Sequence, residues 1–242
     1  MDEFHVAPCL IGIGDSGKEL VENGVESRKR DSAMVPDQNV APEKIILKDQ
    51  EAIASAQVSS FDLVVVTGGF AEQTEIEQAV AVGDAVAPDV ASVAVLSGAS
   101  TTGTVERLSD VFDTVVFGDS QAVAREFATD LFTMFCQPVM LRTDFKQITK
   151  NLSDGVAARV DRHLSDRTQI PDVLKGLESP EEILFGFLEV GGEFTVRDAE
   201  LVEESTAESA VITGQATLAD DAKCRFSILR EVEITKQSRG CC

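Results

Sequence analysis

The sequence predicts an α/β protein with a Rossmann-like, doubly wound parallel sheet, a central helix and then a smaller α+β domain. Short apolar strands alternate with amphipathic helices through the first half of the chain, which is typical of a parallel sheet. The segment 63–66, LVVV, is apolar on both faces, as a central parallel strand should be. We expect a nucleotide-binding-like domain at 1–120, the central helix and its loop at 121–143, an α+β domain at 144–235 and a flexible tail at 236–242.

The first half follows this alternation in order. Apolar runs bounded by turn residues predict strands at 9–13, 44–47, 63–66, 91–96 and 114–117. Apolar residues at helical spacing predict helices at 16–26, 50–58, 72–86, 101–109 and 121–136. Residues 28–42 hold a charge cluster and two prolines without a period, so they predict a surface loop.

In the second half of the chain, strands and helices no longer alternate, and the expected strands are accompanied by a single acidic helix. We expect strands at 155–161, 182–190, 210–217 and 224–234, with the helix at 195–205. The last two strands are joined through residues 218–221, LADD, and this short polar link predicts a hairpin.

The charge excludes several partners. The 42 Asp and Glu against 21 Lys and Arg give a net charge of −21, spread along the chain, which repels nucleic acid and anionic bilayers. Such acidity, with 12 Arg, 9 Lys and neither Trp nor Tyr, favours a halophilic protein, because high salt screens the self-repulsion. The alternative is an acidic mesophilic protein.

Cysteine and histidine usage argues against disulfides and metals. Five cysteines without framework spacing predict reduced thiols in the cytoplasm. Only two histidines are present, His5 and His163, so we expect no metal site. The start of the chain lacks a signal-peptide pattern, and no apolar run reaches the ~18 residues of a membrane span.

Two glycine turns are candidate nucleotide-binding sites. Gly12, Gly14, Asp15, Ser16 and Gly17 form a G-x-G-x-x-G pattern between a strand and a helix, where backbone amides can approach a pyrophosphate. The dinucleotide fingerprint also needs an acid after a second strand, and the region around 31 offers no such strand. A Walker loop would need Ser or Thr where Glu19 stands, so a plain tight turn is the competing interpretation.

The second turn is Thr67, Gly68 and Gly69, after the central strand. Ligands bind at the carboxyl ends of such strands. No serine lies in a nucleophile-elbow frame, and His163 is expected at the surface. Asp144 follows the long helix, where it could position water for phosphoryl transfer or simply cap a turn.

These segments together resemble the tubulin/FtsZ superfamily, particularly its archaeal FtsZ and CetZ branch. The resemblance runs from IGIGDSGKEL and FDLVVVTGG through PVMLRTDFKQI to SPEEILFGFLEVGGEFTV and AVITGQATLADDAKCRFSIL. It implies GTP at the two glycine turns. It also implies that the loop holding Asp144 enters the nucleotide pocket of the next subunit and drives hydrolysis.

The departures from the family pattern imply a degenerate GTP site. Where the family has GGGTGTG, this chain has GGFAEQT, with Phe70 adding bulk and Glu72 adding negative charge where amides should face phosphate. The family's Asn-x-Asp-x-x-Asp matches Arg142, Asp144 and Gln147, so one acid is missing. Asp119 is a poor match to the Asn that recognises guanine. Losing several such groups together should slow phosphoryl transfer by orders of magnitude.

The tail ends Gly240-Cys241-Cys242 and is similar to the doubly prenylated end of Rab-type small GTPases. Lipids on Cys241 and Cys242 would bring the cytoplasmic protein to the inner face of the membrane. The alternative is a tail that merely carries two thiols.

We therefore expect a noncanonical FtsZ/CetZ-like protein without turnover or a required cofactor, acting as a cytoskeletal or cell-division scaffold. Its partner would be itself or another FtsZ/CetZ-type protein. The alternative is an active, polymerising GTPase that binds GTP at the glycine turns and uses Asp144 as catalytic acid. A third, less favoured hypothesis is a Rossmann-type oxidoreductase that uses the first glycine turn.

Overall fold

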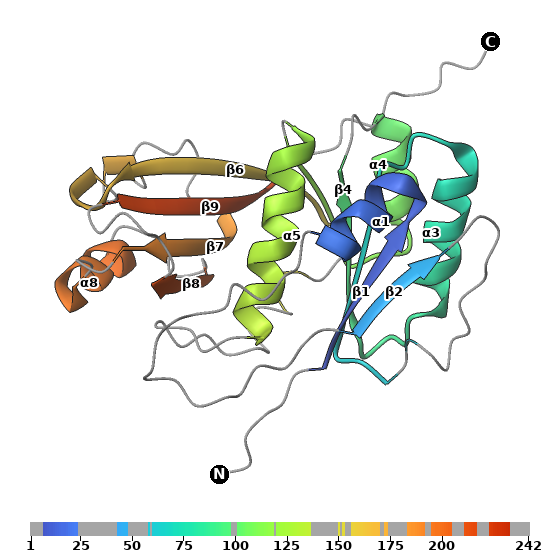
Figure 1. Cartoon of the computed structure of the whole chain (residues 1–242), viewed down its shortest axis with the longest axis horizontal. Coiled ribbons are helices and arrows are strands. Elements are labelled where there is room, and N and C mark those ends of the chain that lie inside the picture. Colours follow the sequence, from blue (N-terminus) through green and yellow to red (C-terminus); the bar gives the residue numbers. More distant parts are fainter. Residues whose placement is uncertain are drawn as a thin grey trace.

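The computed structural model describes residues 7–23, 43–47, 58, 60–97, 101–118, 120–136, 150, 152, 156–169, 172–173, 183–191, 195–204, 211–216 and 223–232. Within these residues the strands form one sheet in the order β2-β1-β3-β4-β5-β6-β9-β7-β8. Figure 1 shows its parallel part and the β6–β9–β7–β8 part on opposite sides of helix α5. The predicted loop 28–42, almost all of the predicted helix 50–58, the link 218–221 and the tail 236–242 lie outside the described residues.

The first five strands are parallel, and all of them except the edge strand β2 are mostly buried. They are β1 (Pro8–Ile13), β2 (Glu43–Leu47), β3 (Leu63–Gly68), β4 (Ala91–Leu96) and β5 (Thr114–Gly118). Their helices are α1 (Gly14–Asn23), α3 (Gln73–Ala85), α4 (Thr102–Ser109) and α5 (Gln121–Cys136). Every residue of β1 and β3 is buried, because both faces of a doubly wound sheet are covered.

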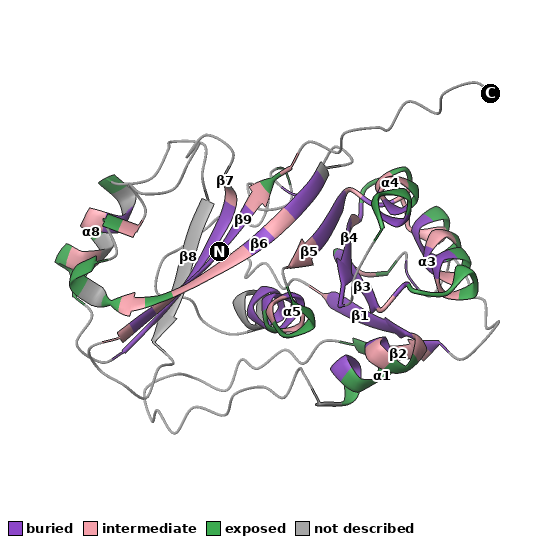
Figure 2. Cartoon of the chain, turned by 90° about the horizontal axis from the view of Figure 1, so that it is seen from above, coloured by how far each residue is buried: buried purple, intermediate pink, exposed green. Residues whose placement is uncertain are grey.

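Two core clusters lie on opposite faces of this sheet. One joins the strands to α1 and α5 through residues such as Leu20 and Phe127. The other joins them to α3 and α4 through residues such as Ile76 and Leu108. Figure 2 shows the buried strands between these two helix pairs. The predicted doubly wound sheet is confirmed.

Strand β6 (Val156–Asp166) connects the two parts of the sheet. Its beginning pairs in parallel with β5, from Thr114 opposite Val156 to Gly118 opposite Val160. From Ala158 onwards it pairs antiparallel with β9 (Lys223–Glu231). A short 3-10 turn at Arg167–Gln169 follows β6.

The predicted hairpin between the last two strands is wrong. Strand β9 lies between β6 and β7 (Ile183–Val190), antiparallel to both. Strand β8 (Val211–Ala216) pairs in parallel with β7, because α8 (Val196–Glu204) makes the crossover that parallel neighbours require. Strand β9 is buried from Phe226 to Leu229, and therefore on both faces, so an interior place in the sheet suits it better than one arm of a hairpin.

A buried charge cluster fastens α5 to the second part of the sheet. Arg162 of β6 donates to Asp130 of α5 at 2.6 Å and, through Nε, to Ser227 of β9 at 3.1 Å. Ser227 donates to the same Asp130 carboxylate at 2.9 Å. Arg162 also contacts Glu126 of α5, and Glu189 of β7 lies 3.7 Å away. These ion pairs complement the apolar packing of α5.

Candidate functional site

The two glycine turns meet at one edge of the sheet. In the parallel pair of β1 and β3, Ile13 lies opposite Gly68, so both strands end at the same level. Helix α1 begins at once with Gly14, and α3 begins at Gln73. The carboxyl edge of a parallel sheet is the usual ligand position. The structure thus places both predicted turns at the same edge of the sheet.

On either side of the junction between β1 and α1, two glycines allow close packing. A Cβ on Gly12 would lie 2.6 Å from the carbonyl oxygen of Gly17, and one on Gly17 would overlap the carbonyl oxygen of Thr67. Both positions let α1 approach the ends of β1 and β3, which supports the tight-turn interpretation for them. Gly14 differs, because its φ is +65°, a conformation that favours glycine.

The turn after β3 is shaped by Phe70. This residue has a φ of +48° and is 1% exposed, packed in the core cluster beneath α3 and α4. A Cβ on Gly68 would lie 2.9 Å from its ring. The expectation that the ring adds bulk at the phosphate-facing surface is therefore wrong. The aromatic ring fills the core below the turn, and the left-handed backbone allows it to point inward.

Glu75 is the site residue that the sequence did not single out. Its Oε2 accepts a hydrogen bond from the backbone N–H of Ala71 at 3.1 Å. In the same turn after β3, Oε2 lies 3.9 Å from a Cβ placed on Gly69. The carboxylate also lies against the turn after β1, since a Cβ on Gly14 would overlap its Oε1. A Glu in the first turn of a helix is the residue that reaches back to N-terminal amides. That pattern is the sequence signal for this role.

The start of α5 reaches the same edge. Gln121 Nε2 donates to Ser16 Oγ at 3.4 Å, and that oxygen lies 3.4 Å from a Cβ placed on Gly69. Arg125 of α5 pairs with Glu19 of α1 at 3.1 Å. The structure thus brings Ser16, Gly69 and the start of α5 together, while Asp15 is exposed.

Two hydroxyls at this edge have unused hydrogen-bonding capacity. Thr67, near the end of β3, and Ser97, directly after β4, are 0% exposed. Neither hydroxyl makes a hydrogen bond within the part of the chain that the structure describes. A buried hydroxyl without a partner costs about 1–3 kcal/mol, so this edge is not fully satisfied by its own contacts.

Several predicted residues lie outside the described residues: Asp119, Asp144, Cys241 and Cys242. The described residues also hold no group of three or more His, Cys, Asp or Glu side chains suited to a metal ion. None of the described helices is long and apolar enough to cross a bilayer.

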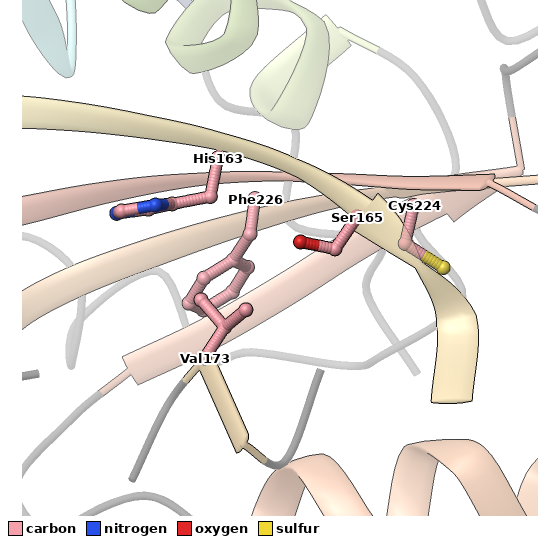
Figure 3. Close-up of a pocket in the computed structure, with 5 residues that line it drawn as sticks. All are labelled: His163, Ser165, Val173, Cys224 and Phe226. Atoms are coloured by element: carbon pink, nitrogen blue, oxygen red, sulfur yellow. The ribbon is translucent and has the colours of Figure 1, made fainter. Parts of the chain in front are cut away.

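A small hollow lies over one face of the paired strands β6 and β9. Figure 3 shows it lined by His163, Ser165, Val173, Cys224 and Phe226. His163 is half-buried rather than at the surface, and its Nε2 has no hydrogen-bond partner among the described residues. The sulfur of Cys224 points away from the imidazole. The hollow therefore presents neither a nucleophile–base pair nor a shared metal site.

Comparison with known proteins identifies the fold. No protein-family model matches the sequence, and no curated protein matches it either. The structure is similar to an FtsZ W319Y mutant from M. jannaschii, with a TM-score of 0.67 and 13% identity over 94% of this chain and 91% of that chain. An FtsZ dimer described as empty, also from M. jannaschii, matches with a TM-score of 0.65 and 14% identity over 97% and 92%. CetZ from Methanosaeta thermophila strain DSM 6194 matches with a TM-score of 0.52 and 9% identity over 93% and 86%. The chain therefore has the FtsZ/tubulin-like fold, as predicted.

Proposed function

We propose that this chain, with its FtsZ/tubulin-like fold, is a noncanonical member of that group whose nucleotide site is degenerate. It serves as a cytoskeletal or cell-division scaffold through protein–protein contacts rather than through turnover. The observation that carries the proposal is the acidic start of α3. Glu72 is its N-cap, without a side-chain capping bond, and Glu75 lies in its first turn with the Ala71 amide already engaged.

Electrostatics explains why this start disfavours a nucleotide. A helix N-terminus binds phosphate through open backbone amides and a partial positive charge. Two carboxylates at that end oppose both contributions. Two like charges about 4 Å apart repel by about 4 kcal/mol at an effective dielectric constant of about 20, before screening by salt. A repulsion of that size is a loss of about a thousandfold in affinity.

The alternative is an active, polymerising GTPase. The meeting of Gly14, Ser16 and Gly69 at one edge supports this alternative, since backbone amides of both glycine turns would be available there to a nucleotide. In that case GTP would lie on the two glycine turns, and Asp144 would act as the catalytic acid.

Nucleotide titration separates the two functions. We expect calorimetry with GTP in molar salt to give no binding heat, and light scattering to be the same with and without GTP. Saturable GTP binding followed by slow hydrolysis would establish the GTPase instead. Binding of NAD alone would contradict both and support a Rossmann-type enzyme.

The partner is expected to be a second copy of this chain or another FtsZ-like protein. One of the similar structures is an FtsZ dimer, which supports an FtsZ-type contact here. Light scattering coupled to size-exclusion chromatography should show a dimer or larger assembly at micromolar concentration. A strictly monomeric chain would leave only the heterotypic contact.

Membrane attachment through the tail is a separate proposal. Lipids on Cys241 and Cys242 would add the mass of two prenyl chains to the protein purified from its native cell. Intact mass spectrometry measures this directly, and an unmodified mass would exclude the lipid anchor.

A further inference from the structure

Glu75 lies across both glycine turns at the carboxyl edge of the sheet. It accepts from Ala71 N–H in the turn after β3, and it fills the space in front of Gly14 in the turn after β1. The carboxylate is therefore shared between two turns that are distant in sequence. A phosphate bound at this edge would meet the same two backbone segments.

The position suits an anion for physical reasons. The N-terminal end of α3 carries the positive end of the helix dipole and N–H groups that have no partner within the helix, and both favour a nearby carboxylate. Gly14, with its positive φ, has no side chain to block the approach. Glu72 lies at the same helix end but makes no side-chain capping bond. Position, more than charge alone, distinguishes Glu75.

A separate observation concerns two buried hydroxyls at the same edge of the sheet. The buried hydroxyls of Thr67 and Ser97, at the ends of two neighbouring strands, make no hydrogen bond within the described residues. Buried polar groups in native proteins usually have a partner. Among the described residues, these two hydroxyls therefore keep the capacity to donate a hydrogen bond to an oxyanion at the carboxyl edge of the sheet.

We propose that Glu75 is an internal anion that takes the place of a phosphate and closes the edge to oxyanion ligands. This inference rests on the proposed degenerate site. The inference adds that the two glycine turns after β1 and β3 could still hold an oxyanion, and that the carboxylate of Glu75 alone keeps them closed to one. Removing that carboxylate should reopen the edge.

The test compares Glu75→Ala with Glu72→Ala as a matched control, since both remove one carboxylate from the same helix end. Pyrophosphate and GTP are titrated into each protein by calorimetry at one fixed salt concentration. We expect Glu75→Ala to bind pyrophosphate at least about tenfold more tightly than the wild type, because removing the carboxylate relieves the part of its repulsion that salt does not screen. A tenfold change corresponds to about 1.4 kcal/mol. Glu72→Ala should gain less than half of that in free energy.

Glu75→Gln provides a second variant with little change in shape. It removes the charge and keeps the acceptor for Ala71, so it should gain less than Glu75→Ala. Hydrogen exchange at the Ala71 amide should quicken in Glu75→Ala and stay unchanged in Glu72→Ala, which shows that the contact exists in solution.

The outcomes separate this inference from the proposed function. If the wild type binds no GTP and neither Glu75 variant gains pyrophosphate binding, the internal anion is wrong and the scaffold stands. If the wild type already binds GTP as tightly as Glu75→Ala does, the degenerate site itself is wrong.

Discussion

In the turn after β3, Phe70 has a strained, left-handed backbone conformation and a buried aromatic ring. Its φ of +48° costs a residue with a Cβ about 1–2 kcal/mol, and the packing of the ring at 1% exposure offsets that cost. The turn therefore has a fixed shape although the sequence there is poor in glycine.

Replacing Phe70 should show both the stabilisation from its buried ring and the cost of its strained backbone. Phe70→Ala should lower the free energy of unfolding by about 3–5 kcal/mol through the cavity it leaves. Phe70→Gly should be no more damaging than Phe70→Ala, because glycine relieves the left-handed strain. Denaturant unfolding measures both. A glycine variant less stable than the alanine variant by about 1 kcal/mol, as at ordinary positions, would contradict the strain.

Cys9 in β1 gives a prediction about alkaline pH. Burial, with a smaller contribution from the charge of Glu43, raises the pKa of its thiol from 9.0 to about 12. The folded state therefore keeps this proton between pH 9 and about 12 while the unfolded state loses it. Stability should fall as the pH rises through that window, because the unfolded state binds fewer protons there.

Thermal unfolding of wild type and Cys9→Ala at pH 8 and pH 10.5 tests this. The sequence has no tyrosine, so lysines and other cysteines are the main remaining groups that titrate there. The loss of stability between the two pH values should be smaller in Cys9→Ala. Equal losses in the two proteins would show that Cys9 does not contribute.

At the scale of elements, α5 is held in two different ways. Toward the second part of the sheet, Asp130 is 2% exposed and bound to Arg162 and Ser227. Toward α1, Arg125 pairs with a half-exposed Glu19. Breaking a buried ion pair costs far more than breaking an exposed one.

Arg162→Met should therefore destabilise the protein by about 3–5 kcal/mol, since it leaves the Asp130 carboxylate buried without its guanidinium. Arg125→Met, on the exposed pair, should change stability by less than about 1 kcal/mol. Urea denaturation of the two variants provides the comparison. Similar losses in both would mean that the buried cluster does not hold α5.

Local sequence patterns predicted these elements well and their contacts less well. The predicted strand 91–96 and helix 121–136 match β4 and α5 residue for residue, because buried runs and helical periods are properties of neighbouring residues. The hairpin failed because strand order depends on which apolar faces meet after folding. The contact of Glu75 with Gly14 joins two helix starts that no local pattern connects. The turns themselves were predictable, but the side chain that lies between them was not.

The whole molecule carries a charge that salt should balance. The net charge is −21 on 242 residues, and the acidic side chains repel one another at low ionic strength. This repulsion is much weaker at 1 M salt, because the Debye length falls from about 10 Å at 0.1 M to about 3 Å at 1 M. The melting temperature should rise between 0.1 and 1 M KCl and then level off. Sucrose at equal osmolality, which acts by exclusion without screening, serves as control and should give a smaller rise.

The two predicted domains should unfold together, because one apolar core extends through both. Leu10 and Val65 of the parallel sheet belong to the same buried cluster as Phe185, Phe187 and Leu229 of the second part. Strand β6 continues the backbone hydrogen bonds from β5 to β9. Separating the two predicted domains would expose this apolar core and would also break the backbone hydrogen bonds that β6 makes with β5 and β9. Calorimetry should therefore show a single transition whose calorimetric and van't Hoff enthalpies agree. Two resolved transitions, or a stable folded fragment 1–143, would show instead that the parts are independent and that α5 is a hinge between them.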